Sequence, residues 1–258
     1  MKPYLPLAAL VAAIALPATA QGSTVERLPD VNGTLLVTGA PAETNLITVE
    51  DDRNAVVIRD DAVPLELVAA GCERLDERAA RCSMVKRVWV DLNDGNDVAT
   101  IASKRVVDIN GGAGNDRYNA VGTEKRSEVD FFGGFGADIA NYGPATEGVI
   151  VGVDGMPFDG RPGDNDRIDR TVETVFGSPY DDVLTGSQRE QRLLGLDGDD
   201  TLAGGPAADE LFGGLGQDTV DARDGEPDTV DCGGQLFDRV TADSAEASIV
   251  GCAEVLVG

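Results

Sequence analysis

Aspartate returns at one position of a nine-residue period between residues 177 and 221. The sixth residue of the five consecutive units is, in chain order, Asp182, Gln191, Asp200, Asp209 and Asp218. Glycines precede these positions, and glycine allows the positive φ that turns successive carbonyl oxygens toward one point. A short carboxylate beside such carbonyls completes an oxygen cage, which suits calcium, a hard cation with about six to eight oxygen ligands. The chain has no His and its four Cys lack zinc-like spacing, so a nitrogen or sulfur metal site is not expected.

The same units predict the strands that position these loops. The eighth residue of each unit is apolar: Leu184, Leu193, Leu202, Leu211 and Val220. Such a residue lies on a short strand and points into a stacked core. A fixed period of this length is typical of a repeat architecture.

The units resemble the RTX family of secreted calcium-binding repeats, whose unit is G-G-x-G-x-D-x-U-x with U a large apolar residue. GGAGNDRYN at 111–119 fits every specified position, and GGFGADIAN at 133–141 fits through Asp138. Looser copies are LNDGNDVAT (92–100), RPGDNDRID (161–169) and GGQLFDRVT (233–241). The resemblance covers about residues 90–241. It implies an all-β fold, a parallel β-roll or β-helix solenoid, with several calcium ions stacked between its loops.

In the implied fold two units make one turn, so loops 18 residues apart share an edge. Asp182, Asp200 and Asp218 have this spacing, whereas the alternate loops GSQREQ and GGPAAD depart from the glycine pattern. Calcium is therefore expected mainly along one edge, with the Gln191 edge free of metal. Upstream steps of 19 and 22 residues extend the line through slightly longer coils. The predicted metal ligands are Asp97, Asp116, Asp138, Asp182, Asp200 and Asp218. Asp166 does not fit the spacing and is left out.

Four segments divide the chain. Residues 1–20 combine a basic start, an apolar run and an A-x-A site, which predicts a signal peptide cleaved after Ala20 and an extracellular location; the alternative is a buried N-terminal helix. Residues 21–90 alternate like β strands and are expected to cap or lead into the solenoid. Residues 91–241 form the RTX-like roll, and residues 242–258 a C-terminal cap strand. No later stretch reaches eighteen apolar residues, so no membrane span is expected.

The four cysteines fit an oxidising compartment. Of the three possible connectivities, local pairing of Cys72 with Cys82 and of Cys232 with Cys252 is favoured. Each disulfide would then stabilise one end of the solenoid. A redox-active thiol pair is the alternative.

Charge and composition narrow the function. The chain has 46 acidic and 21 basic residues and a net charge of −25, which argues against binding nucleic acid or anionic lipid. The absence of His excludes Ser-His, Cys-His and HExxH catalysis, and neither G-x-S-x-G nor a P-loop occurs. The chain is therefore not expected to be an enzyme.

The expected function is that of a secreted calcium-binding repeat protein that folds on calcium binding outside the cell. Clustered carboxylates repel one another and glycine-rich loops are costly to order without the ion. A structural, surface-associated or adhesive module is favoured, with an extracellular glycan or a cell-surface component as partner. The alternatives are a calcium-dependent, lyase-like polysaccharide-active enzyme on a β-solenoid, and a calcium-triggered folding or export device.

Overall fold

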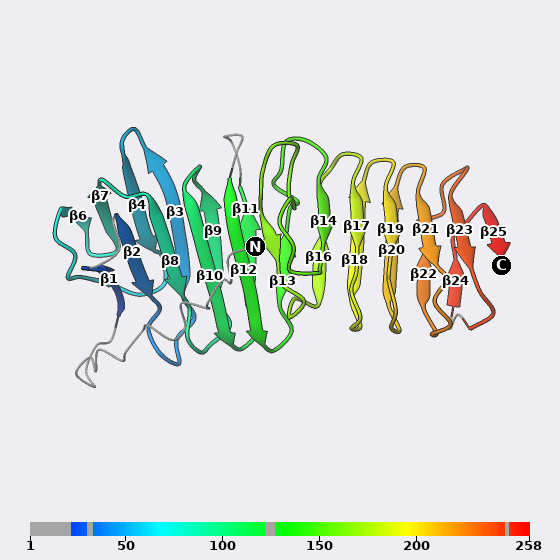
Figure 1. Cartoon of the computed structure of the whole chain (residues 1–258), viewed down its shortest axis with the longest axis horizontal. Coiled ribbons are helices and arrows are strands. Elements are labelled where there is room, and N and C mark those ends of the chain that lie inside the picture. Colours follow the sequence, from blue (N-terminus) through cyan, green and yellow to red (C-terminus); the bar gives the residue numbers. More distant parts are fainter. Residues whose placement is uncertain (1–21, 30–32, 122–126, 246–247) are drawn as a thin grey trace.

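The protein is an elongated stack of β strands (Figure 1). The computed structural model describes residues 22–29, 33–121, 127–245 and 248–258. Throughout this described part, every regular element is a strand, and no helix has the length and apolar character needed to cross a bilayer. The predicted signal peptide at 1–20 lies outside the described residues. The expectation of an all-β chain with mainly parallel sheets is confirmed.

Three sheets contain the strands. The long sheet has the order β24 (Ser248–Val250), β22 (Thr229–Asp231), β20 (Glu210–Leu215), β18 (Arg192–Asp197), β16 (Thr174–Phe176), β13 (Ile139–Asn141), β11 (Arg117–Ala120), β9 (Val98–Ala102), β3 (Leu46–Asp52), β4 (Ala55–Asp60), β7 (Ala79–Ser83) and β6 (Cys72–Asp76). The N-terminal sheet has the order β15 (Arg167–Ile168), β12 (Glu128–Phe135), β10 (Val106–Ala113), β8 (Arg87–Asp91), β2 (Thr34–Thr38), β1 (Ser23–Arg27) and β5 (Leu65–Leu67). The C-terminal sheet has the order β14 (Ile150–Gly152), β17 (Val183–Thr185), β19 (Thr201–Ala203), β21 (Thr219–Ala222), β23 (Arg239–Ala242) and β25 (Glu254–Val257).

The chain coils by alternating between the long sheet and one of the other two. From β8 to β13 it alternates with the N-terminal sheet, and from β16 to β25 with the C-terminal sheet. Strands one turn apart pair in parallel, as β9 does with β11 and β17 with β19. This arrangement is a solenoid, and in Figure 1 the strands from β16 to β25 follow one another along its long axis in chain order.

An excursion between β13 and β16 changes the partner of the long sheet. After β13 the chain forms β14, the first strand of the C-terminal sheet, and then returns to form β15, the last strand of the N-terminal sheet. The segment that leads back from β14 to β15 is fixed by antiparallel bridges between Ile150 and Gly160 and between Asp159 and Asp166. We call residues 142–173 the junction.

Apolar residues at equivalent places in successive coils form the core. The predicted eighth-position residues are all fully buried: Leu184, Leu193, Leu202, Leu211 and Val220. On the long sheet, Val175, Ala140 and Tyr118 are in register with Leu193 and Leu211. Each coil therefore adds a few aliphatic side chains to one continuous core. In the same core Tyr118 packs against Phe131 and Tyr142, with distances of 5.8 and 6.0 Å between the ring centroids.

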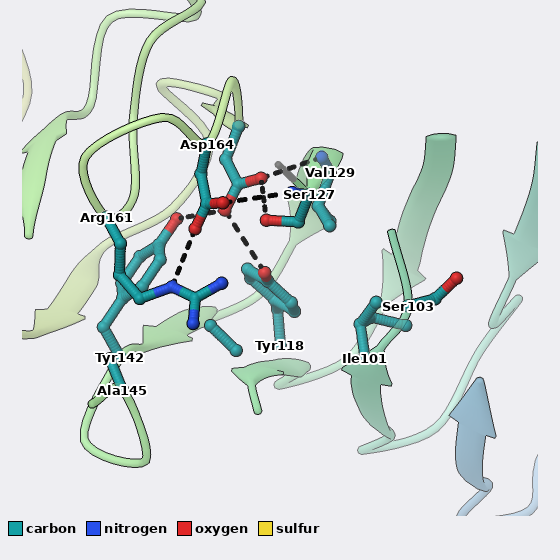
Figure 2. Close-up of a pocket in the computed structure, with 11 residues that line it drawn as sticks. Ile101, Ser103, Tyr118, Ser127, Val129, Tyr142, Ala145, Arg161 and Asp164 are labelled. Atoms are coloured by element: carbon teal, nitrogen blue, oxygen red, sulfur yellow. Dashed lines mark hydrogen bonds and ion pairs between the residues drawn. The ribbon is translucent and has the colours of Figure 1, made fainter. Parts of the chain in front are cut away.

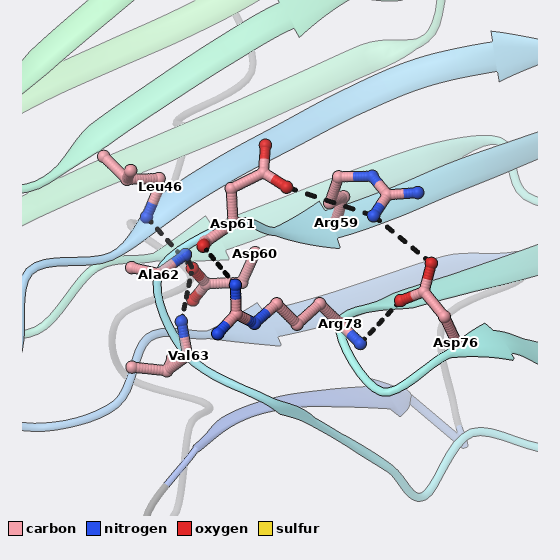
Figure 3. Close-up of polar contacts among 8 residues, drawn as sticks. All are labelled: Leu46, Arg59, Asp60, Asp61, Ala62, Val63, Asp76 and Arg78. Atoms are coloured by element: carbon pink, nitrogen blue, oxygen red, sulfur yellow. Dashed lines mark hydrogen bonds and ion pairs between the residues drawn. The ribbon is translucent and has the colours of Figure 1, made fainter.

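The N-terminal strands continue the same sheets. Parallel pairing joins β2 to β8 and β3 to β9. Antiparallel pairs then extend both sheets, and β5 pairs in parallel with β1 at the edge of the N-terminal sheet. Asp60, at the end of β4, accepts hydrogen bonds from the backbone N–H groups of Leu46, Ala62 and Val63 at 2.9–3.3 Å (Figure 3). Arg59 beside it pairs with Asp76 at 3.3 Å. The hydrogen bonds of Asp60 fix the turn that follows β4.

Both favoured disulfides are present. Cys72–Cys82 joins the paired strands β6 and β7, and Cys232–Cys252 joins the loops that follow β22 and β24. Among the described residues no cysteine is free. The pairing predicted from local spacing is confirmed.

Candidate metal centre

Consider the residues that directly precede the parallel strands of the long sheet from β3 to β22. The strands are in register, so these residues form one line, the first column, at the edge where the strands begin. Its members are Asn45, Asp97, Asp116, Asp138, Glu173, Gln191, Asp209 and Asp228.

A second column lies on the opposite edge, where the chain enters the C-terminal sheet. Its members are Asp182, Asp200, Asp218 and Asp238, which precede β17, β19, β21 and β23. Loops of this kind leave the ends of long-sheet strands, whereas first-column loops lead to their beginnings. The two columns are therefore on different edges of the solenoid.

The prediction that six aspartates share one edge is wrong. Asp97, Asp116 and Asp138 belong to the first column, together with Gln191 and Asp209, while Asp182, Asp200 and Asp218 form the second. A step of 18 residues identifies the same edge only where coils follow one another without interruption. The junction breaks that rule, since 35 residues separate Asp138 from the next member of its column, Glu173.

Two column aspartates were not among the predicted ligands, although Asp238 lies in the looser copy at 233–241. Asp228 follows Asp209 by 19 residues and Asp238 follows Asp218 by 20, so neither keeps the strict period. A signal for both existed, because each is the first residue of a D-x-V-x segment: D-T-V-D at 228–231 and D-R-V-T at 238–241. Asp166, which the spacing had left out, lies in neither column.

One carboxylate oxygen of each aspartate ties two coils together. Oδ1 accepts the backbone N–H of the column member one coil earlier, as Asp116 does from Asp97 at 3.0 Å and Asp138 from Asp116 at 2.8 Å. In the second column Asp200 accepts from Asp182 at 2.8 Å and Asp218 from Asp200 at 3.0 Å. The column residues are therefore structural as well as candidate ligands.

The fifth residue of the loops makes the same bond in the reverse direction. Asn96 accepts the backbone N–H of Asn115 at 2.8 Å, and Asp181 that of Asp199 at 2.9 Å. Adjacent coils thus exchange side-chain-to-backbone hydrogen bonds where the fifth position is Asn or Asp, as at Asn96 and Asp181.

The other oxygen, Oδ2, has no such partner in most column aspartates. Within the described residues, it is buried and makes no hydrogen bond in Asp97, Asp116, Asp138, Asp200, Asp209 and Asp218. Each of these side chains is at most 2% exposed. A buried anionic oxygen without a partner costs free energy and requires an explanation. A cation bound at each of these oxygens would be the missing partner.

Asp182 differs from the other five predicted ligands. Both of its oxygens accept bonds from Ser178, from the backbone N–H at 2.5 Å and from the hydroxyl at 2.7 Å. Serine occupies the second position of this unit, where the repeat has glycine. Asp182 therefore has less capacity left for a cation than Asp200 or Asp218.

Glycines allow the loops to approach one another and the carboxylates. A Cβ at Gly195 would lie 2.1 Å from Oδ2 of Asp200, so only glycine fits at the first position. At the fourth position, Gly114 and Gly216 have φ of 132° and 137°, and a Cβ there would lie 1.5 and 2.0 Å from the carbonyl oxygens of Gly95 and Gly198. Loop carbonyls thus point along the stack, in the same loops as the carboxylates, and the donor set is oxygen only. This donor set fits calcium.

Burial makes the column carboxylates hard to ionise without a cation. Desolvation raises the pKa of Asp97, Asp116, Asp138 and Asp218 to about 6 and that of Asp200 to about 8, with neighbouring carboxylates adding to the effect. A bound divalent cation would reverse this balance, because it favours the charged form.

Asp166 belongs to a different polar cluster, which also contains Tyr118, Tyr142 and Ser127, labelled in Figure 2. Its Oδ1 accepts hydrogen bonds from Ser127 and the backbone of Val129 at 3.1 and 3.0 Å, and its Oδ2 receives the hydroxyls of Tyr118 and Tyr142 at 3.5 and 3.4 Å. Burial raises the pKa of Asp166 to about 7. This cluster connects the core to the junction and has hydrogen-bond donors around Asp166, so it is not a cation site of the column type.

Comparison with known proteins places part of this region in a family. The model of the RTX calcium-binding nonapeptide repeat matches residues 192–226 with four copies, a range that contains loops of both columns. No curated protein matches the chain. Residues 192–226 therefore belong to the RTX calcium-binding nonapeptide repeats.

Proposed function

We propose that this chain is a secreted, non-catalytic calcium-binding protein whose solenoid completes its folding when several calcium ions bind between the coils. The observation that carries the proposal is the set of buried Oδ2 atoms without hydrogen bonds in RTX-type loops. Calcium would be held by column aspartates, Asp116, Asp138, Asp200 and Asp218 foremost, together with loop carbonyls. The bound calcium would neutralise the stacked carboxylates. Because the sites exist only in the folded state, the free energy of calcium binding would then stabilise the fold.

The role proposed for the folded solenoid is structural, surface-associated or adhesive. The solenoid presents flat sheet faces, and the chain lacks the His on which hydrolase triads and zinc proteases depend. Extracellular calcium modules bind with dissociation constants of about 10⁻⁴–10⁻³ M, so the protein would be unfolded in part inside the cell and folded outside. An extracellular glycan or a cell-surface component is the partner class that we propose.

Calcium titration of the purified protein, followed by far-UV circular dichroism, tests the calcium-dependent folding. The β signal should increase with a midpoint near 10⁻⁴–10⁻³ M, and magnesium at the same concentration should have a weaker effect because it prefers a compact octahedral site with several waters. An unchanged spectrum up to about 10 mM calcium, together with no bound calcium by mass spectrometry, would exclude the proposed function.

A further inference from the structure

The loop after β21 departs from the repeat and brings an additional carboxylate to the first column. Residues 222–228 read A-R-D-G-E-P-D instead of the glycine-rich pattern. Asp224, in this loop, accepts the backbone N–H of Glu226 at 2.7 Å and that of Ala207, one coil earlier, at 3.0 Å. Its side chain is thereby fixed between loop 222–228 and loop 204–209.

Three carboxylates meet there. One oxygen each from Asp209, Asp224 and Asp228 lies within 4.8 Å of the others. Asp209 and Asp228 are 2% and 0% exposed, and Oδ1 of Asp228 accepts the backbone N–H of Asp209 at 2.8 Å. Three anionic groups at this separation repel one another strongly unless a cation is shared among them.

Asp209 gives independent evidence for a ligand. Its Oδ1 accepts the backbone N–H of Gln191 at 2.7 Å, whereas its Oδ2 is buried and makes no hydrogen bond within the described residues. Arg223, the residue before Asp224, does not neutralise the three carboxylates, because its guanidinium donates to Asp221 with hydrogen bonds of 2.8 and 2.6 Å.

We infer that Asp209, Asp224 and Asp228 bind one calcium ion between loops 204–209 and 222–228. This inference rests on the proposed function and extends it to the edge that the nonapeptide spacing predicted to be free of metal. The site differs from the repeat sites in its donors. Pro206 and Ala207 replace the third residue and the glycine of the usual loop, and the side chain of Asp224 supplies an oxygen from outside the motif. A set of three carboxylates suits a hard divalent cation.

The experiment is calcium counting by native mass spectrometry on the full protein and two matched variants. Asp224→Asn removes one charge from the cluster. Asp243→Asn is the control, because Asp243 makes the equivalent bonds one coil later, to the backbone N–H of Gly225 at 2.6 Å and of Ala245 at 2.8 Å, but is not in the cluster. We expect Asp224→Asn to bind one calcium fewer than the wild type and Asp243→Asn to bind the same number. An equal count in all three proteins would overturn the inference while leaving the proposed function intact.

A crystal structure of the wild-type protein with calcium gives a second result that does not depend on the folding of a variant. An anomalous peak between Asp209, Asp224 and Asp228 supports the inference. Occupied sites at Asp200 and Asp218 without a peak at this cluster refute it. If the wild type binds no calcium at all, the proposed function fails first, so the two failures are distinguishable.

Discussion

At the scale of single residues, the two oxygens of most column aspartates have different surroundings. Oδ1 accepts a backbone N–H from the adjacent coil, and Oδ2 is buried without a hydrogen bond and is the atom that we propose binds the cation. The first contact needs only a hydrogen-bond acceptor, whereas the proposed cation binding needs charge. An Asp→Asn substitution separates the two, because asparagine keeps one carbonyl oxygen and loses the charge.

Asp200→Asn should therefore weaken calcium binding more than it disturbs the fold. We expect the calcium midpoint of folding to rise by roughly tenfold or more, the scale of affinity loss seen even for groups that only support metal ligands. The control is Asp197→Asn, the same chemical change at an exposed position of the same loop. Circular dichroism during calcium titration measures both, and equal midpoints for the two variants would contradict the role of Asp200.

Gly195→Ala tests the steric part of the same site. The new Cβ would lie 2.1 Å from Oδ2 of Asp200 and 2.5 Å from the carbonyl oxygen of Gly213, so the carboxylate must move. In the presence of calcium we expect the free energy of unfolding to fall by about 1–3 kcal/mol, the cost of overpacking a tight site. In Gly152→Ala the nearest atom to the new Cβ is 3.8 Å away, and thermal unfolding of this variant should match that of the wild type. A wild-type melting curve for Gly195→Ala would show that the carboxylate position is not fixed.

At the scale of elements, the junction decides which loops face which edge. It ends the N-terminal sheet at β15 and begins the C-terminal sheet at β14, while the long sheet continues through β16. Its interior is polar: Asp166 accepts hydrogen bonds from the hydroxyls of Tyr118 and Tyr142, and Asp159 accepts the backbone N–H groups of Gly152 and Ile168 at 2.7 and 2.8 Å. Desolvation raises the pKa of both carboxyl groups to about 7.

These raised pKa values predict a pH dependence of stability. Because the native pKa of Asp166 is about 7 and the unfolded value is about 4, the native state holds one more proton between these limits. The stabilisation is complete below about pH 4 and is lost as pH rises through about 7, with a slope of up to about 1.4 kcal/mol per pH unit for each such group. In saturating calcium, chemical denaturation from pH 5 to pH 8 should show stability falling, with a smaller slope in Asp166→Asn. An identical slope in that variant would assign the titration to other groups.

At the scale of the whole molecule, the two ends of the solenoid depend on calcium to different degrees. The N-terminal strands β1–β7 are closed by antiparallel pairing, by Asp60 and its backbone contacts (Figure 3), and by the Cys72–Cys82 disulfide. The coils from β9 onward are connected by loops with buried carboxylates. Their stability should therefore require the ion, whereas that of the N-terminal strands should not.

Hydrogen–deuterium exchange with and without calcium tests this division. Without calcium we expect slow exchange for β3, β4 and β7 and fast exchange for β17–β23, because stacked carboxylates with raised pKa values destabilise those coils. With calcium both regions should be protected. Equal protection of the two regions in the absence of calcium would show that the solenoid folds without its ions.

Much of the fold could be predicted from the sequence because the repeat is a local pattern. A nine-residue period with Gly, Asp and an apolar residue at fixed places specifies a loop, a candidate ligand and a buried side chain. The apolar residues at the eighth position, from Leu184 in the first unit to Val220 in the fifth, are fully buried as expected. The two disulfides were also predictable, since each pair brackets one short segment. Asp228 and Asp238 were not found, because longer loops put them out of phase by one and two residues.

The sequence by itself determined that the chain is a parallel β solenoid with oxygen-rich loops, because period, glycine and apolar position act within one coil. Only the tertiary structure decided which aspartates share an edge, since that depends on the path of the chain through residues 142–173, where no repeat sets the spacing. It also brought Asp224 to Asp209 and Asp228, a contact across coils. The physical reason is the same in both cases: the edge and the neighbours of a loop are set by accumulated chain length between coils, and irregular segments change that length without changing the local pattern.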